Sequence, residues 1–484
     1  MIKKRGGARM NEKNSTEQHR RPLFDVLKQH EKKEKVSFHV PGHKNGINWD
    51  ESLDSFHSML PFDQTEVSGL DYLHEPVGAI KESQDLLSGL YGSKKSYYLI
   101  NGSTVGNLAM VMGATNKGDQ VFVDRSCHQS VIHALELAEL RPIFLTPELT
   151  ELDEAPLGIT LERLKEAFGN YPSVKALIVT YPTYDGMVYP LKELIDHARK
   201  SECLVLVDEA HGPHFTLGDP FPASALDLGA DVVVQSAHKM LPSFTQTAYL
   251  HIGKQASLSL ENKVEHYLHI FQSSSPSYPL MLSLEYARYF LAFFNEKDLK
   301  TTLEYRDLWK KQFEHAGIEF LQSSDPLKAR VSWADHSGEV LAAQLEKQGI
   351  FGEKIDHATV LLTFPLLKQG TDVGKPFSIQ LLQQEENEWI KNKKKTVSID
   401  PYTELDLDYD SQKKRTIERI RLEEAEGRIA AQNITPYPPG IPFVLKGERL
   451  TIEQIKQLEY YLSQSMRVVG LGNEMDLAVF SEND

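Results

Sequence analysis

Two segments of the chain place ionisable side chains at the ends of apolar runs. VLVDEAHGPH has Asp208 at the end of one run, and VVVQSAHK has Ser236, His238 and Lys239 at the end of the next. A lysine amine can form an imine with an aldehyde cofactor, and a carboxylate can keep a pyridine nitrogen protonated so that the ring accepts electrons. Alone, Asp208 would be read as a helix cap and Lys239 as a solvated residue. Together they predict pyridoxal chemistry.

A turn of Gly and small hydroxyl residues opens a helix in INGSTVGNLAMVMGA. Backbone N–H groups at a helix start, with the hydroxyls of Ser103 and Thr104, can bind an anion such as a cofactor phosphate. Ser and Thr are also ordinary helix caps, so this segment gains weight only beside Asp208 and Lys239.

Other strand ends carry further candidates, each with a structural alternative. His128 in VFVDRSCHQSV could stack on the face of an aromatic ring or serve as a structural hydrogen-bonding residue. Thr183 and Tyr184 in TYPTYDG could bind the ring hydroxyl of the cofactor or make a turn, and the turn is preferred.

The elements that must position these residues alternate between apolar runs and helical stretches from about Val77 to Asn295. The runs QVFVD, VKALIVTYPT, CLVLVDEA and DVVVQSA are rich in Val, Leu and Ile and are bounded by turn residues. This pattern predicts an α/β fold with a mostly parallel sheet that is covered on both faces. Ligands gather at the carboxyl ends of such strands, where the candidate residues fall.

The chain divides into four predicted parts. They are a flexible tail over 1–20, an N-terminal arm with binding loops over 21–76, a large cofactor-binding domain over 77–298, and a smaller C-terminal α/β domain over 299–484. In the last part, ARVSWAD, GEVLAAQLEKQGI and HATVLLTFPL predict strand, helix and strand, and a terminal helix is expected over 452–466.

Composition narrows the class of protein. The 484 residues are 40% hydrophobic, which suffices for the core of a large enzyme, and no apolar run is long enough to cross a membrane. The net charge of −15 disfavours nucleic-acid binding. Cys127 and Cys203 are the two cysteines, too few for a disulfide framework or a cysteine-based metal site, so no metal is expected. We expect a cytoplasmic protein.

Eight segments in order resemble the pyridoxal-phosphate-dependent ornithine/lysine/arginine decarboxylase family, between about Ser37 and Gly447. They are PGHKNG, TEVSGLDYLHEP, NGSTVGN, DRSCHQS, PTYDG, DEAHGPHF, SAHKMLPSFTQTA and PYPPGIP. The resemblance implies an aspartate-aminotransferase-like fold (fold type I) with pyridoxal 5′-phosphate as cofactor. It also implies a homodimer or higher oligomer with the active site at the subunit interface.

The resemblance assigns roles around the cofactor ring. Lys239 would form the internal aldimine, Asp208 would bind the pyridine nitrogen, His128 would stack on the ring, and Ala210 and His211 would pack near it. Reprotonation of the product carbanion would fall to Lys239 or His211.

The resemblance also assigns a phosphate site, formed by Ser103, Thr104, Ser236 and His238. Ser274 in QSSSPSYP would reach the phosphate of the neighbouring subunit.

Two departures from the family pattern bear on substrate and assembly. There is no room before Ser37 for the N-terminal wing domain of the large degradative members, which implies a short form, and Gln129 stands where the family commonly has Lys. The substrate would be arginine, lysine or ornithine, with arginine ranked slightly first. Glu66, Asp71 and Glu353 are candidate partners for its cationic side chain, although a structural role is favoured for each.

The expected reaction is decarboxylation to the amine, a polyamine precursor. An aminotransferase or aldolase-type enzyme of the same fold is the alternative within enzymes, since Asp208 and Lys239 would serve these chemistries too. A non-catalytic, cofactor-binding regulatory partner of another decarboxylase is the alternative from a different class.

Overall fold

The structure is a computed structural model, and it describes residues 17–33, 36–152, 155–374, 376–382, 400–437, 442–463, 466–472 and 475–482. Residues 1–16 of the predicted tail therefore lie outside the described residues. The chain forms two compact units. The first comprises residues 1–114 and 206–296, and the second comprises residues 115–205 and 297–484. The predicted domain boundaries follow the chain in sequence order and stay a prediction.

Four strands of the first unit lie in the order β1-β9-β8-β7. Their bounds are Lys95–Leu99 for β1, Leu204–Asp208 for β7, Val232–Gln235 for β8 and Ala248–Ile252 for β9. β7 and β8 are parallel, whereas β9 runs antiparallel to both β8 and β1. The sequence predicted β7 and β8, but it did not predict this antiparallel edge. The link from β8 to β9 contains only the four-residue helix α10 and returns the chain in the opposite direction, as antiparallel pairing requires.

Among its described residues, the first unit contains eight α-helices, of which α4, α5, α9, α10 and α12 contact this sheet. Their bounds are Pro22–Glu31 (α2), Asp54–His57 (α3), Ala79–Tyr91 (α4), Gly102–Ala114 (α5), Ala225–Leu228 (α9), Ala237–Met240 (α10), Leu258–Phe271 (α11) and Tyr278–Ala292 (α12). A Cβ on Gly106 of α5 would lie 2.7 Å from a methyl of Leu99 and 2.8 Å from one of Val234. The glycine therefore lets the first turns of α5 rest directly on β1 and β8.

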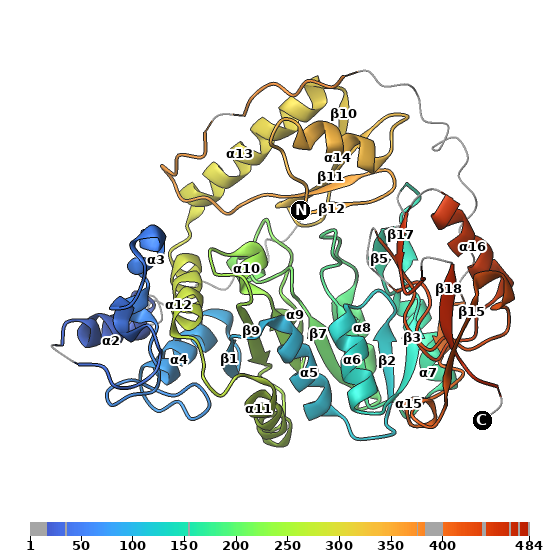
Figure 1. The fold of residues 1–484 in the computed structure, drawn as a ribbon, viewed down its shortest axis with the longest axis horizontal. Helices are drawn as coiled ribbons and strands as arrows, with labels where there is room; N and C mark the ends of the chain where they lie inside the picture. Colours follow the sequence, from blue (N-terminus) through green and yellow to red (C-terminus); the bar gives the residue numbers. More distant parts are fainter. Residues whose placement is uncertain are drawn as a thin grey trace, which may run out of the picture. The chain divides into compact units, whose positions relative to one another are not determined.

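The N-terminal helix α2 is fastened to the rest of the first unit by a buried acid on α12. The Glu285 carboxylate accepts the backbone N–H groups of Leu23 at 3.0 Å and Phe24 at 2.9 Å. No side chain caps α2 at its own N-cap, Arg21. Glu285 thus satisfies helix N–H groups that would otherwise lack partners. Figure 1 shows α2, α4 and α12 side by side, and the contacts between these helices agree.

The second unit contains four strands in the order β6-β2-β3-β14, with β2 parallel to β6 and β3. A separate antiparallel sheet has the order β10-β11-β13-β12, and α14 packs against it (Figure 1). The strands are Gln120–Asp124 (β2), Arg141–Leu145 (β3), Glu148–Leu149 (β4), Pro156–Gly158 (β5), Ala176–Thr180 (β6), Ile318–Gln322 (β10), Lys328–Trp333 (β11), Lys354–Ile355 (β12), Val360–Thr363 (β13), Tyr402–Glu404 (β14), Ile417–Arg421 (β15), Thr435–Tyr437 (β16), Arg467–Val469 (β17) and Asp476–Phe480 (β18).

Helices of the second unit confirm the predicted order of elements near the C-terminus. They are Gln129–Leu137 (α6), Leu161–Asn170 (α7), Leu191–Lys200 (α8), Glu296–His315 (α13), Gly338–Glu346 (α14), Tyr409–Gln412 (α15) and Ile452–Ser463 (α16). β11, α14 and β13 are the predicted strand, helix and strand, and α16 is the predicted terminal helix. Ile455 and Leu458 of α16 are buried in a core with Val444, Leu477 and Val479.

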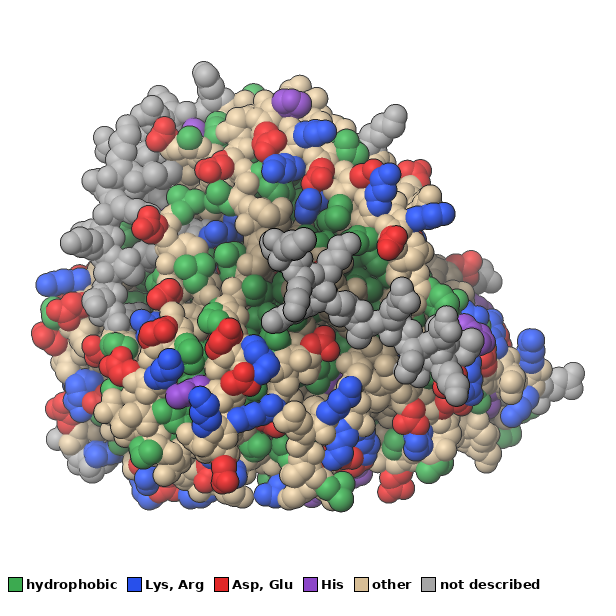
Figure 2. Space-filling view, turned by 180° about the vertical axis from the view of Figure 1, so that it is seen from behind, with side chains coloured by type: hydrophobic (Ala, Val, Ile, Leu, Met, Phe, Trp, Pro, Cys, Tyr) green, Lys and Arg blue, Asp and Glu red, His purple; other side chains and the backbone are tan. Residues whose placement is uncertain are grey.

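The surface carries charges of both signs. Figure 2 shows acidic and basic side chains interspersed on the face drawn, without a continuous basic area. Among the described residues, no helix combines the length and apolar character that a membrane span requires.

Candidate active site

The ends of β7 and β8 lie side by side in the first unit, as the sequence predicted. Asp208 pairs in parallel register with Val234. Beyond the strands, the Glu209 N–H donates to the Val234 carbonyl at 2.8 Å, and the Ser236 N–H donates to the Ala210 carbonyl at 3.3 Å. The pairing therefore continues into the two loops that carry the candidate residues.

Asp208 is a buried carboxylate that accepts hydrogen bonds from two neutral groups. Its Oδ2 accepts the Asn107 side-chain amide at 2.8 Å, and its Oδ1 accepts the Ala210 N–H at 3.1 Å. Sequence reasoning missed Asn107, which is fully buried on α5. A signal was available, because Asn107 is the one amide in the apolar part of NGSTVGNLAMVMGA and follows Ser103 by one helical turn.

Lys239 lies on α10, directly after β8, and contacts a buried histidine from the end of β7. Its Nζ is 3.2 Å from His211 Nε2. Lys239 is half-buried and His211 is buried. An ammonium on Lys239 donates in this contact, so His211 then accepts at Nε2 and carries its proton on Nδ1. The structure thus joins the amine to a group able to accept or return a proton.

Hydroxyls from two elements meet at the start of α5. The buried Ser236 donates its hydroxyl to Ser103 Oγ at 2.9 Å, and Thr104 beside them is exposed. Gly102 has a φ of +80°, a left-handed conformation that favours glycine and lets the chain turn sharply into the helix. Two hydroxyls and the amides of the first turn of a long helix suit an anion.

His238 and Ser274 hold backbone contacts in the same unit. His238 Nδ1 lies 2.9 Å from the Thr247 carbonyl, so that nitrogen carries a proton and donates it. Ser274 is exposed, and its carbonyl accepts the Tyr72 hydroxyl at 3.2 Å. The motifs TEVSGLDYLHEP and QSSSPSYP therefore touch, although they are far apart in sequence. The predicted phosphate contacts of both residues stay predictions.

Asp71, a candidate partner for the substrate, is engaged in capping α4. Its carboxylate accepts the N–H groups of Val77 at 3.0 Å, Gly78 at 2.8 Å and Ile80 at 2.9 Å. These bonds support the structural reading of Asp71. Glu66 is exposed in the same unit.

In the second unit, His128 is the N-cap of α6. Its Nδ1 accepts the Ser130 backbone N–H at 3.1 Å and lies 2.8 Å from the Ser130 hydroxyl oxygen. The ring is exposed, with its orientation set by these two contacts. The capping role is the structural alternative raised for His128, and stacking on a cofactor ring stays a prediction.

Thr183 and Tyr184 lie in a turn after β6. The Thr183 N–H donates to the Met187 carbonyl at 3.0 Å, which closes the preferred turn. The Tyr184 hydroxyl donates to Glu353 Oε1 at 2.8 Å. Burial, followed by the charge of Glu353, raises the pKa of Tyr184 well above its ordinary value, so the phenol stays protonated. Glu353 therefore already has a neutral partner.

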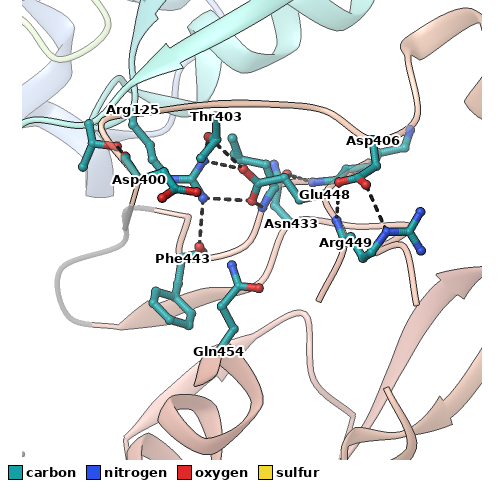
Figure 3. A network of polar contacts seen from close by, with 12 residues as sticks. Arg125, Asp400, Thr403, Asp406, Asn433, Phe443, Glu448, Arg449 and Gln454 are labelled. Carbon is teal, nitrogen blue, oxygen red and sulfur yellow. Dashed lines mark hydrogen bonds and ion pairs between the residues drawn. The ribbon is translucent and has the colours of Figure 1, made fainter. Parts of the chain in front are cut away.

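Three residues before His128, Arg125 forms a buried ion pair with Glu448. Figure 3 shows the two side chains facing each other, and Arg125 Nη2 lies 2.8 Å from Glu448 Oε2. Arg125 also donates to Thr403 Oγ1 and to the Phe443 carbonyl, each at 3.1 Å. Burial opposes the charge of Arg125, but the charge of Glu448 prevails and raises the Arg125 pKa. Sequence reasoning missed this pair.

We expect Glu448→Gln to destabilise the second unit by about 3–5 kcal/mol, because it leaves the guanidinium of Arg125 buried without its counter-charge. Chemical unfolding followed by near-ultraviolet circular dichroism measures the change. Asp406→Asn is the matched control, because Asp406 pairs with Arg449 at 3.0 Å in the same network (Figure 3) but on the surface. We expect the control to cost about 1 kcal/mol or less. Equal losses for both variants would contradict the importance of the buried pair.

Comparison with known proteins identifies the family. Residues 21–329 match the model of the Orn/Lys/Arg decarboxylase major domain, and residues 393–469 match that of the Orn/Lys/Arg decarboxylase C-terminal domain. The chain belongs to this family. The resemblance drawn from the motifs is thus confirmed, and with it the prediction of an amino-acid decarboxylase.

Relatives match along nearly the whole chain. The arginine decarboxylase of Bacillus subtilis is 32% identical over 479 residues, covering 94% of this chain and 96% of its own length. The uncharacterized protein YaaO of the same organism is 40% identical, covering 93% of this chain and 96% of its own. The lysine decarboxylase LdcF of Francisella novicida has the same fold, with a TM-score of 0.78 at 20% identity over 96% of this chain and 81% of its own. The predicted fold class is confirmed.

Proposed function

We propose that this decarboxylase uses pyridoxal 5′-phosphate to convert a basic amino acid, arginine in the first place, into its amine and carbon dioxide. The observation that carries the proposal is the pairing of two strand ends, which sets buried Asp208 beside the segment of Ser236 and Lys239. The family membership supports the same chemistry.

The residues of the first unit fit this cofactor. Asp208 is a buried carboxylate that accepts hydrogen bonds from two neutral groups, the Asn107 amide and the Ala210 N–H, which suits a cationic pyridinium nitrogen. The hydroxyls of Ser103 and Ser236, 2.9 Å apart at the start of α5, suit a phosphate. Lys239 supplies the amine for covalent attachment. When bound, the cofactor supplies an electron sink for the electrons that remain when carbon dioxide departs.

The protein's own side chains would hold and transfer the protons and bind the cofactor. Asp208 would hold a proton at the pyridine nitrogen, which keeps the sink cationic. His211 would accept or return a proton through its 3.2 Å contact with Lys239, so that either of them could deliver a proton to the product carbon. His128 would lie over the ring, and Thr104, His238 and Ser274 would complete the phosphate site.

Arginine is placed first because, among the relatives named as decarboxylases, the arginine decarboxylases have the higher identities, at 28% to 32%. The lysine decarboxylases of Pseudomonas aeruginosa and Escherichia coli are 25% and 23% identical. The amine product would be a polyamine precursor, and the cytoplasm is the proposed location.

We also propose a homodimer. Three apolar side chains of the N-terminal arm, Val36, Phe38 and Ile47, and the adjoining Val77 are at least 80% exposed in the single chain. Apolar surface of this kind is expected to be covered by a partner. Light scattering should give at least twice the 54.8 kDa of one chain, and a monomer at working concentrations would contradict the proposal.

Separate incubation of the cofactor-loaded protein with arginine, lysine and ornithine tests the reaction and its substrate. We expect carbon dioxide from each productive incubation, with agmatine from arginine as the fastest product. Chromatography of the amines identifies the substrate. A keto acid together with pyridoxamine phosphate would favour the aminotransferase alternative. A visible cofactor band that none of the three amino acids perturbs would favour the non-catalytic partner.

A further inference from the structure

Glu209, the residue after Asp208, is a second fully buried carboxylate in the first unit. Glu209 accepts hydrogen bonds from three neutral groups: the Ser224 hydroxyl at 2.9 Å, the Ala225 N–H at 2.6 Å and the Gln235 side-chain amide at 2.6 Å. Burial raises the pKa of Glu209 to about 8, although these donors oppose that shift. Glu209 therefore joins the loop after β7 to the start of α9 and to the last residue of β8.

The bond to Gln235 belongs to a longer buried array. Gln235 Oε1 lies 3.1 Å from His251 Nε2 on β9, and His251 Nδ1 lies 2.7 Å from the Ser96 hydroxyl on β1. Burial lowers the pKa of His251 to about 3, so the ring is neutral and has one proton. An amide oxygen only accepts, so that proton is on Nε2, and Ser96 donates to Nδ1. Ser96 therefore donates to His251, His251 donates to Gln235, and Gln235 donates to Glu209.

At its Glu209 end, the array joins the segment of Asp208 and His211 to the segment of Ser236 and Lys239, the residues of the proposed reaction. Glu209 stands between Asp208 and His211 in sequence, and Gln235 directly precedes Ser236 and stands four positions before Lys239. Past the strand ends, the backbone contributes the bond from Glu209 N–H to Val234 and the longer 3.3 Å bond from Ser236 N–H to Ala210. The Glu209–Gln235 bond is therefore a side-chain link across the point where the strands separate into loops.

We propose that Glu209 and Gln235 are positioning residues, whose bond fixes the loop of Asp208 and His211 relative to the loop of Ser236 and Lys239. The proposal rests on the proposed function for its catalytic consequence. Its structural consequence can be measured without cofactor. Small displacements of reacting groups cost large factors in rate, so a link of this kind affects turnover without touching the substrate.

Gln235→Met tests the link, because methionine keeps the length of the side chain but neither donates to Glu209 nor accepts from His251. We expect faster hydrogen exchange over residues 235–241 in the cofactor-free protein. We also expect cofactor affinity and kcat each to fall roughly 10-fold or more, with KM changing by about two-fold at most. Gln84→Met is the matched control, since Gln84 is also a buried glutamine of this unit and its Oε1 accepts the Tyr98 N–H at 2.9 Å.

A pair of further variants separates positioning from a general loss of stability. Gln235→Glu alone replaces the amide that donates to Glu209 with a second acid, so above about pH 8, where both acids are ionised, it should behave like Gln235→Met. Combined with Glu209→Gln, it restores an amide and a carboxylate to the pair, so exchange and kcat should recover to within about three-fold of wild type. If Gln235→Met does not fold, the comparison of Gln235→Glu with the double variant still tests the link.

The inference is overturned if Gln235→Met matches Gln84→Met in exchange, cofactor affinity and kcat, or if the double variant is no better than Gln235→Glu. Failure of the proposed function would be read separately, on the wild-type protein, as absence of carbon dioxide release. In that case the exchange of residues 235–241 still decides whether the link holds the two loops.

Discussion

Lys239→Ala is expected to abolish decarboxylation and covalent attachment of the cofactor. The substitution removes the amine that forms the bond to the cofactor and also the group that contacts His211 at 3.2 Å. Loss of a covalent attachment site that also transfers a proton should lower kcat by about 10³-fold or more. Carbon dioxide release measures turnover, and borohydride reduction followed by peptide mass spectrometry locates the attachment site.

Two further variants make this result specific to Lys239. Lys239→Arg keeps a cation beside His211, but a guanidinium does not form the imine, so we expect the same loss of attachment with the fold intact. Lys254→Ala removes an exposed lysine of the same unit and should leave both readouts unchanged. Decarboxylation at the wild-type rate by Lys239→Ala would refute the assignment, and a cofactor mapped to another lysine would relocate the site.

Much of the fold could be predicted because the relevant signals are local. The runs around β2, β6, β7 and β8 are short, rich in branched apolar residues and bounded by turn residues, and a buried parallel strand requires this composition. Asp208 and Lys239 could be placed at neighbouring strand ends because each directly follows such a run. The direction of β9 depends instead on how the chain turns after α10, which apolar periodicity does not encode.

The polar contacts within the site were predicted less well, because they join residues that are distant in sequence. Asn107 reaches Asp208 across 101 positions, and Arg125 reaches Glu448 across 323. A single sequence gives the residue types but not the partners. Asp71 illustrates the same limit: a structural role was favoured for it, but its partners, the first N–H groups of α4, were not predicted. For His128 a structural hydrogen-bonding role was raised, but its partner, the Ser130 N–H at the start of α6, was not predicted.

Asp208→Asn separates the electronic role of this residue from its structural role. The amide is nearly the same size and can still accept one hydrogen bond, so we expect the protein to fold and to bind the cofactor. An amide has no charge with which to keep the pyridine nitrogen protonated, so kcat should fall by about 10²–10⁴-fold with a much smaller change in KM. Steady-state carbon dioxide release and cofactor titration measure the two effects.

Two control variants make this prediction specific to the charge of Asp208. Asp227→Asn removes an exposed carboxylate of the same unit, whose pKa is raised by desolvation, and should leave kcat unchanged. Asn107→Leu removes a neutral donor from Asp208 while keeping its charge, so its loss of kcat should be smaller than that of Asp208→Asn. If Asp208→Asn kept kcat within about ten-fold of wild type, Asp208 would not be the group that keeps the electron sink charged. Such a result would turn attention to Glu209, whose buried carboxylate lies on the adjacent residue but is engaged by Ser224, Ala225 and Gln235.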